Sequence, residues 1–298
     1  MTLIKGRPQT LFNYEGEYNM ETLLQAFEAK HPTRMVVATH FKAATGQELD
    51  WNTVTKNNLR KFKDYLRDKY ATNTARSYCS QLRDILSEND DIHPMPKGYK
   101  GVLAVKTGVS QHTYLNEEEI ARISAYQPTC RGEWIIRNQF LAGCYTGARH
   151  SDYIAFSNRN IHDNVLKYVS VKTNHDTVVP VCPALLRIIR ENEEQEFIGV
   201  TFSEVYFNRT MKKICRKVGI DNEMQLYVEG KMQTRPKWGF ITSHTARRSF
   251  ATNLYLNGVD IYTISRMCGH TSVDMTKTYI CCPPKIDAQT QAFFDRQK

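Results

Sequence analysis

The chain has 298 residues, a length that favours two domains, and 41% of them are hydrophobic, which is enough for ordinary packed cores. The sequence has no apolar run of about 18 residues, as a transmembrane helix would require. Its first residues, MTLIKGRPQT, lack the apolar core of a signal peptide. We therefore expect a soluble, cytoplasmic protein with no membrane partner.

Positive charge is spread over the whole chain, whose formal net charge is +9. Residues 1–112 hold 16 Lys and Arg against 12 Asp and Glu, a net +4, and residues 113–298 hold 24 against 19, a net +5. Dispersed positive charge favours a polyanionic partner, of which DNA and RNA are the obvious class. On charge alone, a basic protein that binds no nucleic acid is an equal alternative.

The 8 cysteines include no CxxC pair and no Cys/His cluster with zinc-finger spacing. Cys281 and Cys282 are neighbours in the chain and cannot easily bond to each other. Reduced, mostly buried thiols in a reducing compartment are the expected state. The pattern indicates no metal site.

The N-terminal part of the chain is predicted to be helical, because apolar residues recur there at helical spacing. The stripe of one helix is Leu59, Phe62, Leu66 and Tyr70, and that of the next is Ala75, Tyr78, Leu82, Ile85 and Leu86. The expected helices cover residues 20–29, residues 33–44, Thr53 or Thr55 to about Tyr70, and a segment that starts near Thr72 or Thr74.

Several cations of the two later helices fall away from these apolar stripes. For each one alone, a solvated helix surface is the simpler interpretation. As a set they would suit contacts with DNA phosphates. The candidates for DNA binding are Lys56, Arg60, Lys63, Arg76 and Arg83.

A break in the pattern separates two predicted domains. Residues 90–112 are rich in Pro and Gly and show little periodicity, which is typical of a linker. Asn116, followed by Glu119 and an apolar run, resembles a capping box at the start of a new helix. We expect an N-terminal helical domain over 1–105, a linker over 106–112 and a second domain over 113–298.

The second domain is predicted to combine helices with a small β-hairpin. Apolar residues alternate on both sides of a polar stretch at 173–176, so residues 165–181 are expected to form the hairpin. The expected helices cover 131–144, ended by Gly147; a segment capped by Ser243 that ends near Gly258; a short one from Asp260 to Gly269; and 272–280 and 286–297. The fold class is therefore mainly α with a small β-sheet or hairpin, a mixed α+β second domain following the helical first one.

Four short segments of the second domain supply what phosphodiester cleavage without a metal requires: TGARHSD at 146–152, SVKTN at 170–174, SHTARRSFAT at 243–252 and CGHTSVDMTKTY at 268–279. Negative charge grows on the non-bridging oxygens in the transition state and must meet fixed cations. Arginine suits this task, because its planar fork grips two oxygens and stays protonated. A nucleophile, a base and an acid complete the set.

The candidate groups are weak signals separately and specific only in combination. Arg149 follows a Gly turn, and His244 and Arg247 are three residues apart, so they share a helix face. His270 follows Gly269, and Tyr279 lies nine residues further on. Lys172 lies near the tip of the expected hairpin, from which a long side chain could reach a leaving group.

With these residues the chain resembles the tyrosine recombinases, also called the phage integrase family. In that family the first box reads T-G-x-R-x-S-E/D, the second H-x-x-R-x-x-F/A-T, and the third G-H-x-S with a Tyr nine residues after the His. TGARHSD and GHTSVDMTKTY match the first and the third, and HTARRSFAT matches the second with one more residue, Ala251, before its Thr. The resemblance covers most of the chain and is specific in these boxes.

The resemblance implies roles for the matching residues. Arg149 and Arg247 would clamp the scissile phosphate, and His270 would hydrogen-bond a non-bridging oxygen. His244 would serve in proton transfer with Tyr279, which would form a 3′-phosphotyrosyl bond that conserves the phosphodiester energy, so that neither ATP nor a metal is needed. Lys172 would be the general acid, with Lys167 as a possible competitor, and Asp152 would support the site structurally.

Three positions depart from the family pattern. Arg248 stands where many members have His, Cys268 where Leu is common, and Cys281 where His is frequent. None of them removes a catalytic position. The change at Arg248 is expected to alter packing or a phosphate contact.

The resemblance also implies an architecture and a partner. The N-terminal helices would form a core-binding (SAM-like) domain, and the two domains would form a C-shaped clamp around double-stranded DNA at an attachment site. A homo-tetramer on DNA is implied, with a monomer possible when free. The last residues, DAQTQAFFDRQK, would dock either on a neighbouring subunit or on their own; the two are equally open.

The expected function is that of a site-specific recombinase or integrase of a phage or mobile element. A type IB topoisomerase-like nicking and closing enzyme would share the chemistry. A catalytically inactive DNA-binding relative is an alternative of another class. The target sequence, and the choice among integration, excision, inversion and dimer resolution, cannot be read from the sequence.

Overall fold

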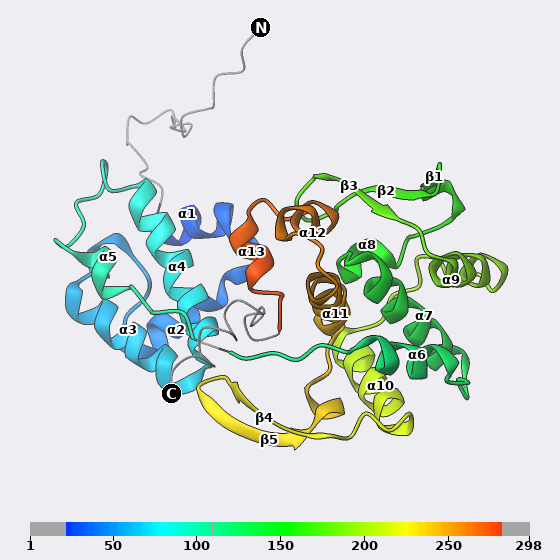
Figure 1. Ribbon diagram of the computed structural model, residues 1–298. Helices are drawn as coiled ribbons and strands as arrows, with labels where there is room; N and C mark the ends of the chain where they lie inside the picture. Colours follow the sequence, from blue (N-terminus) through cyan, green and yellow to red (C-terminus); the bar gives the residue numbers. More distant parts are fainter. Residues whose placement is uncertain (1–21, 109, 282–298) are drawn as a thin grey trace, which may run out of the picture. The chain divides into compact units, whose positions relative to one another are not determined.

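The computed structural model describes residues 22–108 and 110–281, which form two compact units (Figure 1). Of these described residues, one unit holds those up to Ser110 together with Glu229–Lys231, and the other holds Gln111–Val228 and those from Met232 onward. Both are mainly helical, as predicted, and the strands are few and short. In the described ranges, no helix is long and apolar enough to span a bilayer.

The first unit is a cluster of helices with one apolar core. Helix α3 is capped by Thr55, whose hydroxyl accepts the Asn58 N–H at 3.2 Å. Of its predicted stripe, Leu59, Phe62 and Leu66 are fully buried, whereas Tyr70 is the C-cap and is half-buried. The elements are α1 (Leu23–Lys30), η1 (Pro32–Arg34), α2 (Val36–Thr45), η2 (Trp51–Thr53), α3 (Lys56–Lys69), α4 (Thr72–Glu88) and α5 (Tyr99–Val102).

The four expected N-terminal helices are confirmed with shifted ends. Residues 20–21, where the first was expected to begin, lie outside the described residues, and α1 starts at Leu23 behind a capping box on Thr22. Helix α2 starts at Val36 rather than residue 33, because Pro32 sets up a short 3₁₀ turn first. In α4, the predicted stripe residues Ala75, Leu82, Ile85 and Leu86 are buried together with Cys79, whereas Tyr78 is half-buried.

The second unit carries the remaining helices, the sheet of β1 to β3, and the two-stranded sheet of β4 and β5 apart from Lys231 and the turn before it. Its helices are α6 (Glu117–Ala125), α7 (Arg131–Thr146), α8 (His150–Tyr153), α9 (Pro183–Glu194), α10 (Glu204–Lys217), α11 (Ser243–Leu256), α12 (Ile261–Met267) and α13 (Val273–Lys277), with η3 (Asn158–Asn160) and η4 (Lys237–Phe240). Its strands are β1 (Ile161–His162), β2 (Val165–Val169), β3 (Asp176–Pro180), β4 (Glu223–Val228) and β5 (Lys231–Pro236). The predicted helix at 286–297 lies outside the described residues.

The predicted hairpin is confirmed as β2 and β3, which pair antiparallel with Leu166 opposite Val179. Two features were missed. Strand β1 precedes β2 across a turn in which Asp163 and Asn164 both have positive φ, a conformation that Asp and Asn tolerate. The segment after α10 forms the paired strands β4 and β5 around a Glu229–Gly230 turn, where only helices were expected.

Helix α11, which carries the HxxR box, is the central helix of the second unit (Figure 1). It packs against α7, α10 and α12. Gly143 of α7 permits this approach, because a Cβ there would lie 2.9 Å from the Ala246 Cβ. The predicted cap is wrong by one residue: Thr242 caps α11 through a capping box with Thr245, and Ser243 is the first helical residue.

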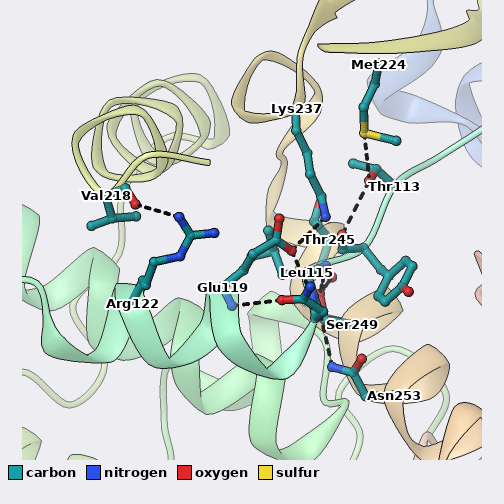
Figure 2. A network of polar contacts seen from close by, with 12 residues as sticks. Thr113, Leu115, Glu119, Arg122, Val218, Met224, Lys237, Thr245, Ser249 and Asn253 are labelled. Atoms are coloured by element: carbon teal, nitrogen blue, oxygen red, sulfur yellow. Dashed lines mark hydrogen bonds and ion pairs between the residues drawn. The ribbon is translucent and has the colours of Figure 1, made fainter. Parts of the chain in front are cut away.

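Polar contacts fasten the start of the second unit to α11 (Figure 2). The Ser249 hydroxyl accepts the Leu115 N–H at 2.8 Å, and the Asn253 amide donates to the Leu115 carbonyl at 3.0 Å. The predicted capping box is confirmed, since Asn116 and Glu119 exchange hydrogen bonds. Glu119 also pairs with Lys237 at 2.6 Å. These contacts fix the helix on which two candidate catalytic residues lie.

Candidate active site

The four sequence boxes come together in the second unit, where hydrogen bonds link them to one another. Helix α7 ends at Gly147, whose φ is +66°, and a Cβ there would lie 2.3 Å from the Phe250 ring of α11. Arg149 follows this turn, as predicted, and is the N-cap of α8. The turn therefore brings the first box directly against the helix of the second.

Arg149 is held by a chain of hydrogen bonds that begins at Asp152. The Arg149 Nη1 donates to the Ser170 hydroxyl at 2.9 Å, and that hydroxyl donates to Asp152 Oδ2 at 3.0 Å. The other carboxylate oxygen, Oδ1, accepts the Val171 N–H at 3.0 Å. Asp152 is only 5% exposed. One buried carboxylate thus positions both an arginine and the start of the β2–β3 turn.

Arg247 is one of the most deeply buried side chains, at 1% exposure. Its Nη1 donates to the Gly147 carbonyl at 2.7 Å and its Nη2 to the Cys268 carbonyl at 2.5 Å. These two bonds join the second box to the first and third. The Nε is buried without a hydrogen-bond partner in the described residues, and three N–H groups stay available to an anion.

His270 follows the tight end of α12 at Gly269, whose φ is +59°. Its Nδ1 lies 2.9 Å from the hydroxyl of Thr276, which is fully buried. Burial, and then the charges of Arg247 and Arg149, lower the pKa of His270 to about 3. The ring is therefore neutral at physiological pH, and its Nε2 is buried with no partner in the described part of the chain.

Tyr279 lies two residues past α13 and its ring is half-buried. The ring centroid is 5.0 Å from that of His270 and 5.2 Å from the Cζ of Arg247. The main chain on both sides is fixed by the buried Thr252 of α11. That hydroxyl donates to the Tyr279 carbonyl at 3.3 Å and accepts the Cys281 N–H at 3.0 Å.

His244 lies one turn before Arg247 and Arg248 on α11, with part of its surface open to solvent. Burial against the surrounding protein, followed by the charge of Arg248, lowers the pKa of His244; Arg247 and Lys172 add to this, and Glu204 opposes it. The neutral imidazole, which can accept a proton, is therefore favoured.

The two candidate lysines lie in different places on the hairpin. Lys172 lies in the exposed turn directly after Val171, as predicted, and its charge acts on His244. Lys167 is in mid-strand opposite Val178 and is exposed. Its neighbours Leu166 and Tyr168 are on the inward face of β2, and side chains alternate along a strand, so Lys167 is on the outward face. The placement favours Lys172.

Three buried nitrogen atoms of the site have no hydrogen-bond partner among the described residues. Arg247 Nε, Arg248 Nε and His270 Nε2 all belong to residues packed against the Tyr279 ring. Buried donors normally find a partner, and arginines with a neutral imidazole form a suitable site for a phosphate. Among the residues described, no group of three or more His, Cys, Asp and Glu side chains is placed to bind a metal ion.

The N-terminal cations lie on the surface of the first unit. Lys56 and Arg60 of α3 and Arg76 of α4 are exposed, whereas Lys63 and Arg83 are half-buried. The charges of Lys63 and Arg83 both act on Cys79, so these two lie on neighbouring parts of α3 and α4. Arg83 also donates to the Ser80 hydroxyl at 3.1 Å.

Three hydroxyl residues of the site were not anticipated from the sequence. Ser170 carries the bond between Arg149 and Asp152, Thr252 holds the main chain of Tyr279, and Thr276 holds His270. Each of them lies inside a segment quoted for its charged or aromatic residues. The Thr that ends the second box was the available signal for Thr252, since it is part of the pattern itself.

The comparison with known protein families gives one match: the profile of the phage integrase family covers residues 113–282, more than half of the chain. The chain therefore belongs to the phage integrase family, the tyrosine recombinases. This is the family that its sequence boxes indicated.

Individual relatives are distant. The integrase of Escherichia phage P2 is 27% identical over 194 residues, which is 65% of this chain but only 49% of that relative, so the chain spans about half of it. The tyrosine recombinase XerC of Chlamydia caviae is 21% identical over 299 residues, 95% of this chain and 91% of that protein. XerC of Pediococcus pentosaceus is 27% identical over 86% and 87% of the two chains.

Solved structures share the fold. A lambda integrase tetramer bound to a Holliday junction has a TM-score of 0.64 at 18% identity, over 90% of this chain and 81% of that one. A lambda integrase dimer bound to a COC′ core site has a TM-score of 0.65 at 17% identity, over 90% and 79%. At this identity the likeness establishes the architecture, and the chemistry is argued from the side chains.

Proposed function

We propose that this protein is a site-specific DNA recombinase or integrase of a phage or mobile element, and that it cuts and rejoins DNA through a 3′-phosphotyrosyl intermediate on Tyr279. One observation carries the proposal. Arg247 and His270 pack against the Tyr279 ring, and each keeps a buried nitrogen without a partner in the described residues. A phosphate beside the phenol would satisfy both nitrogens.

The reaction would begin with the phosphate held between Arg149 and Arg247, whose charges meet the growing charge on the non-bridging oxygens. His270 would add a hydrogen bond from Nε2. That nitrogen carries the proton when the Thr276 hydroxyl donates to Nδ1, the tautomer that leaves a donor free. Asp152 would keep Arg149 in place through Ser170.

In the chemical step, the Tyr279 oxygen would attack phosphorus while its proton passes to the neutral His244. The bond between phosphorus and the 5′ oxygen would break, and Lys172 would give that oxygen a proton, so that it leaves as a hydroxyl. Rejoining would reverse these transfers with a new 5′ hydroxyl. The phosphotyrosyl bond conserves the phosphodiester energy, so the proposed cycle consumes no ATP and calls for no metal.

The partner would be double-stranded DNA carrying attachment sites. The integrase structures of similar fold are a dimer on a core site and a tetramer on a Holliday junction. By analogy, residues 1–105 would be a core-binding domain, 113–298 the catalytic domain, and the working assembly a homo-tetramer. The cations Lys56, Arg60, Lys63, Arg76 and Arg83 would contact phosphates.

The test is covalent capture of DNA. The protein is incubated with a nicked suicide duplex that carries the attachment site, taken from the DNA flanking the element that encodes it, and adducts are separated on a denaturing gel. We expect an adduct with the wild type, none with Tyr279→Phe, and unchanged DNA binding by that variant. Tyr262→Phe, which alters an exposed tyrosine of α12, is the matched control.

Each other outcome identifies an alternative. An adduct that persists in Tyr279→Phe would refute the nucleophile assignment. DNA binding without an adduct from the wild type would favour an inactive DNA-binding relative. Relaxation of supercoiled plasmid that lacks attachment sites would favour a nicking and closing enzyme.

A further inference from the structure

We propose that Arg248 is a positioning residue for the nucleophile, which holds the Tyr279 ring and supplies a second fixed cation against that ring. The inference rests on the proposed attack by Tyr279. It assigns a task to the position at which this sequence departs from the His common in its family. Arg248 is not one of the catalytic set assigned above.

Arg248 contacts the ring of Tyr279. The Arg248 Cζ lies 5.4 Å from the centroid of the Tyr279 ring, and the Cζ of Arg247 lies 5.2 Å from it. A guanidinium at this range is attracted to the π-electrons of the ring. Two neighbouring residues of one helix thus hold the same aromatic side chain, and His270 packs against it as well.

Arg248 lies on the same face of α11 as two other residues of the site. His244, Arg248 and Thr252 are spaced by four residues on α11, so their side chains follow one another along one face. Thr252 binds the main chain at Tyr279, and Arg248 contacts the ring. Arg248 therefore lies between the main-chain anchor of the nucleophile and the residue proposed to take its proton.

Among the described residues, no carboxylate forms an ion pair with Arg248. Within the described residues no ion pair or hydrogen bond of its side chain is found, and its Nε is buried without a partner. Burial lowers the pKa of Arg248, and the nearby Cys281 and Tyr279 oppose that shift. A half-buried cation without a counter-ion costs stability. A negative charge that arises beside it during the reaction would remove this cost.

The charge of Arg248 also acts on groups around the nucleophile. After burial, it is the main cause that lowers the pKa of both His244 and His112. A neutral His244 can accept the phenol proton, and a fixed cation then stabilises the phenolate that is left. The ionisable groups that interact electrostatically with Arg248 are His112, His244, Tyr279 and Cys281, and Arg247 precedes it in the chain.

The experiment compares Arg248→Lys, Arg248→Gln and Arg248→His with the wild type in single-turnover formation of the covalent adduct on the nicked duplex. Loss of the cation in Arg248→Gln should slow adduct formation about 10- to 100-fold, while Arg248→Lys keeps most of the rate. DNA affinity, measured in the Tyr279→Phe background, should change far less. Arg131→Gln is the matched control, because the Arg131 Cζ lies 4.9 Å from the Phe197 ring outside the site.

The histidine variant separates a charge effect from a packing effect. A histidine at this position is a cation at low pH and neutral at high pH, with an ordinary pKa of about 6.5 that burial and neighbouring cations lower. Its rate relative to the wild type should therefore fall as the pH rises from about 5 to about 8. A residue that only fills space would give a constant ratio. This measurement stays informative if Arg248→Gln does not fold.

The possible failures can be told apart. If the wild type forms no adduct, the proposed function fails. If the wild type and Arg131→Gln form adducts, and Arg248→Gln and Arg248→His form them at the wild-type rate at every pH, only the inference about Arg248 is overturned. A slow Arg248→Gln with a pH-independent Arg248→His ratio would also overturn it, since the role would then be packing.

Discussion

The imidazole ring of His270 lies against the ring of Tyr279, with centroids 5.0 Å apart and planes inclined by 31°. The nine-residue spacing that first marked this pair therefore corresponds to direct packing. Between the two residues, the chain forms α13 and returns, and Thr276 on that helix bonds to His270. The third box is therefore one continuous segment, built around α13, that brings the side chains of His270 and Tyr279 together.

Thr276→Val should slow adduct formation with little effect on DNA affinity. It keeps the shape of a buried side chain but removes the hydroxyl that fixes the His270 tautomer. We expect a loss of stability of about 1 kcal/mol and a clearly larger kinetic effect. Thr278→Val is the control, because Thr278 is exposed and its hydroxyl donates to the Met275 carbonyl, away from His270. Equal rates for the two variants would contradict the role of Thr276.

The acid limb of the pH–rate profile should lie below the ordinary histidine value of about 6.5. As the pH falls through the pKa of His244, the imidazolium forms and can no longer accept the Tyr279 proton. Burial and the Arg248 charge lower that pKa, so activity should persist to lower pH. Single-turnover rates across pH, with His244→Gln as the variant that loses the limb, measure this. A limb above the ordinary value would refute the assignment.

Asp152→Asn should destabilise the second unit by about 1 to 3 kcal/mol. An amide presents a donor where Ser170 and Val171 both donate to the carboxylate, so one of the bonds is lost. Urea unfolding measures the change. Asp163→Asn is the matched control, since Asp163 is exposed in a turn with φ of +48°, where Asn is equally tolerated. Similar effects of both substitutions would speak against the network.

Gly269→Ala should cost more stability than Gly258→Ala. Both glycines have positive φ, which strains an alanine by about 1 kcal/mol. At Gly269 the added Cβ would also lie 2.7 Å from the Thr177 hydroxyl, whereas at Gly258 nothing lies within 4 Å. The close approach should add about 1 to 3 kcal/mol. Thr177→Ala in the Gly269→Ala background should recover part of the loss, and no recovery would contradict this cause.

Affinity for the duplex should fall steeply with salt, because bound cations release counter-ions from phosphates. The double variant Arg60→Gln/Arg76→Gln should reduce the slope of log affinity against log salt by about 2. Lys30→Gln is the control, since the Lys30 ammonium is paired with Glu88. A slope unchanged by the double variant would remove these two residues from the interface.

Local signals in the sequence predicted much of this structure. The caps at Thr55 and Asn116, the glycine ends of α7 and α12, and the β2–β3 hairpin depend on residues only a few positions apart. The spacing of the boxes identified the residues around Tyr279, because short motifs with fixed separations become specific when combined.

What could not be predicted depends on partners far apart in the chain or on weak turn signals. Thr252 meets the Tyr279 main chain 27 residues away, and Ser170 meets Asp152 18 residues away. No periodicity marks such a hydroxyl. Strands β1, β4 and β5 were missed because the Asp163–Asn164 and Glu229–Gly230 turns are less distinctive than Asn-Gly or Asp-Gly.

The two hydrogen bonds from Arg247 to main-chain carbonyls affect how a protein with this site could lose the proposed activity. Loss of the Tyr279 hydroxyl would remove the proposed nucleophile alone. Loss of Arg247 would also remove the two hydrogen bonds that link the turn at Gly147 to the loop at Cys268. A lineage that ceased to cut DNA could therefore discard the nucleophile long before the arginine. In a related protein, the two arginines without the tyrosine would indicate only that the fold is retained. The tyrosine together with the arginines would indicate that DNA cleavage is retained.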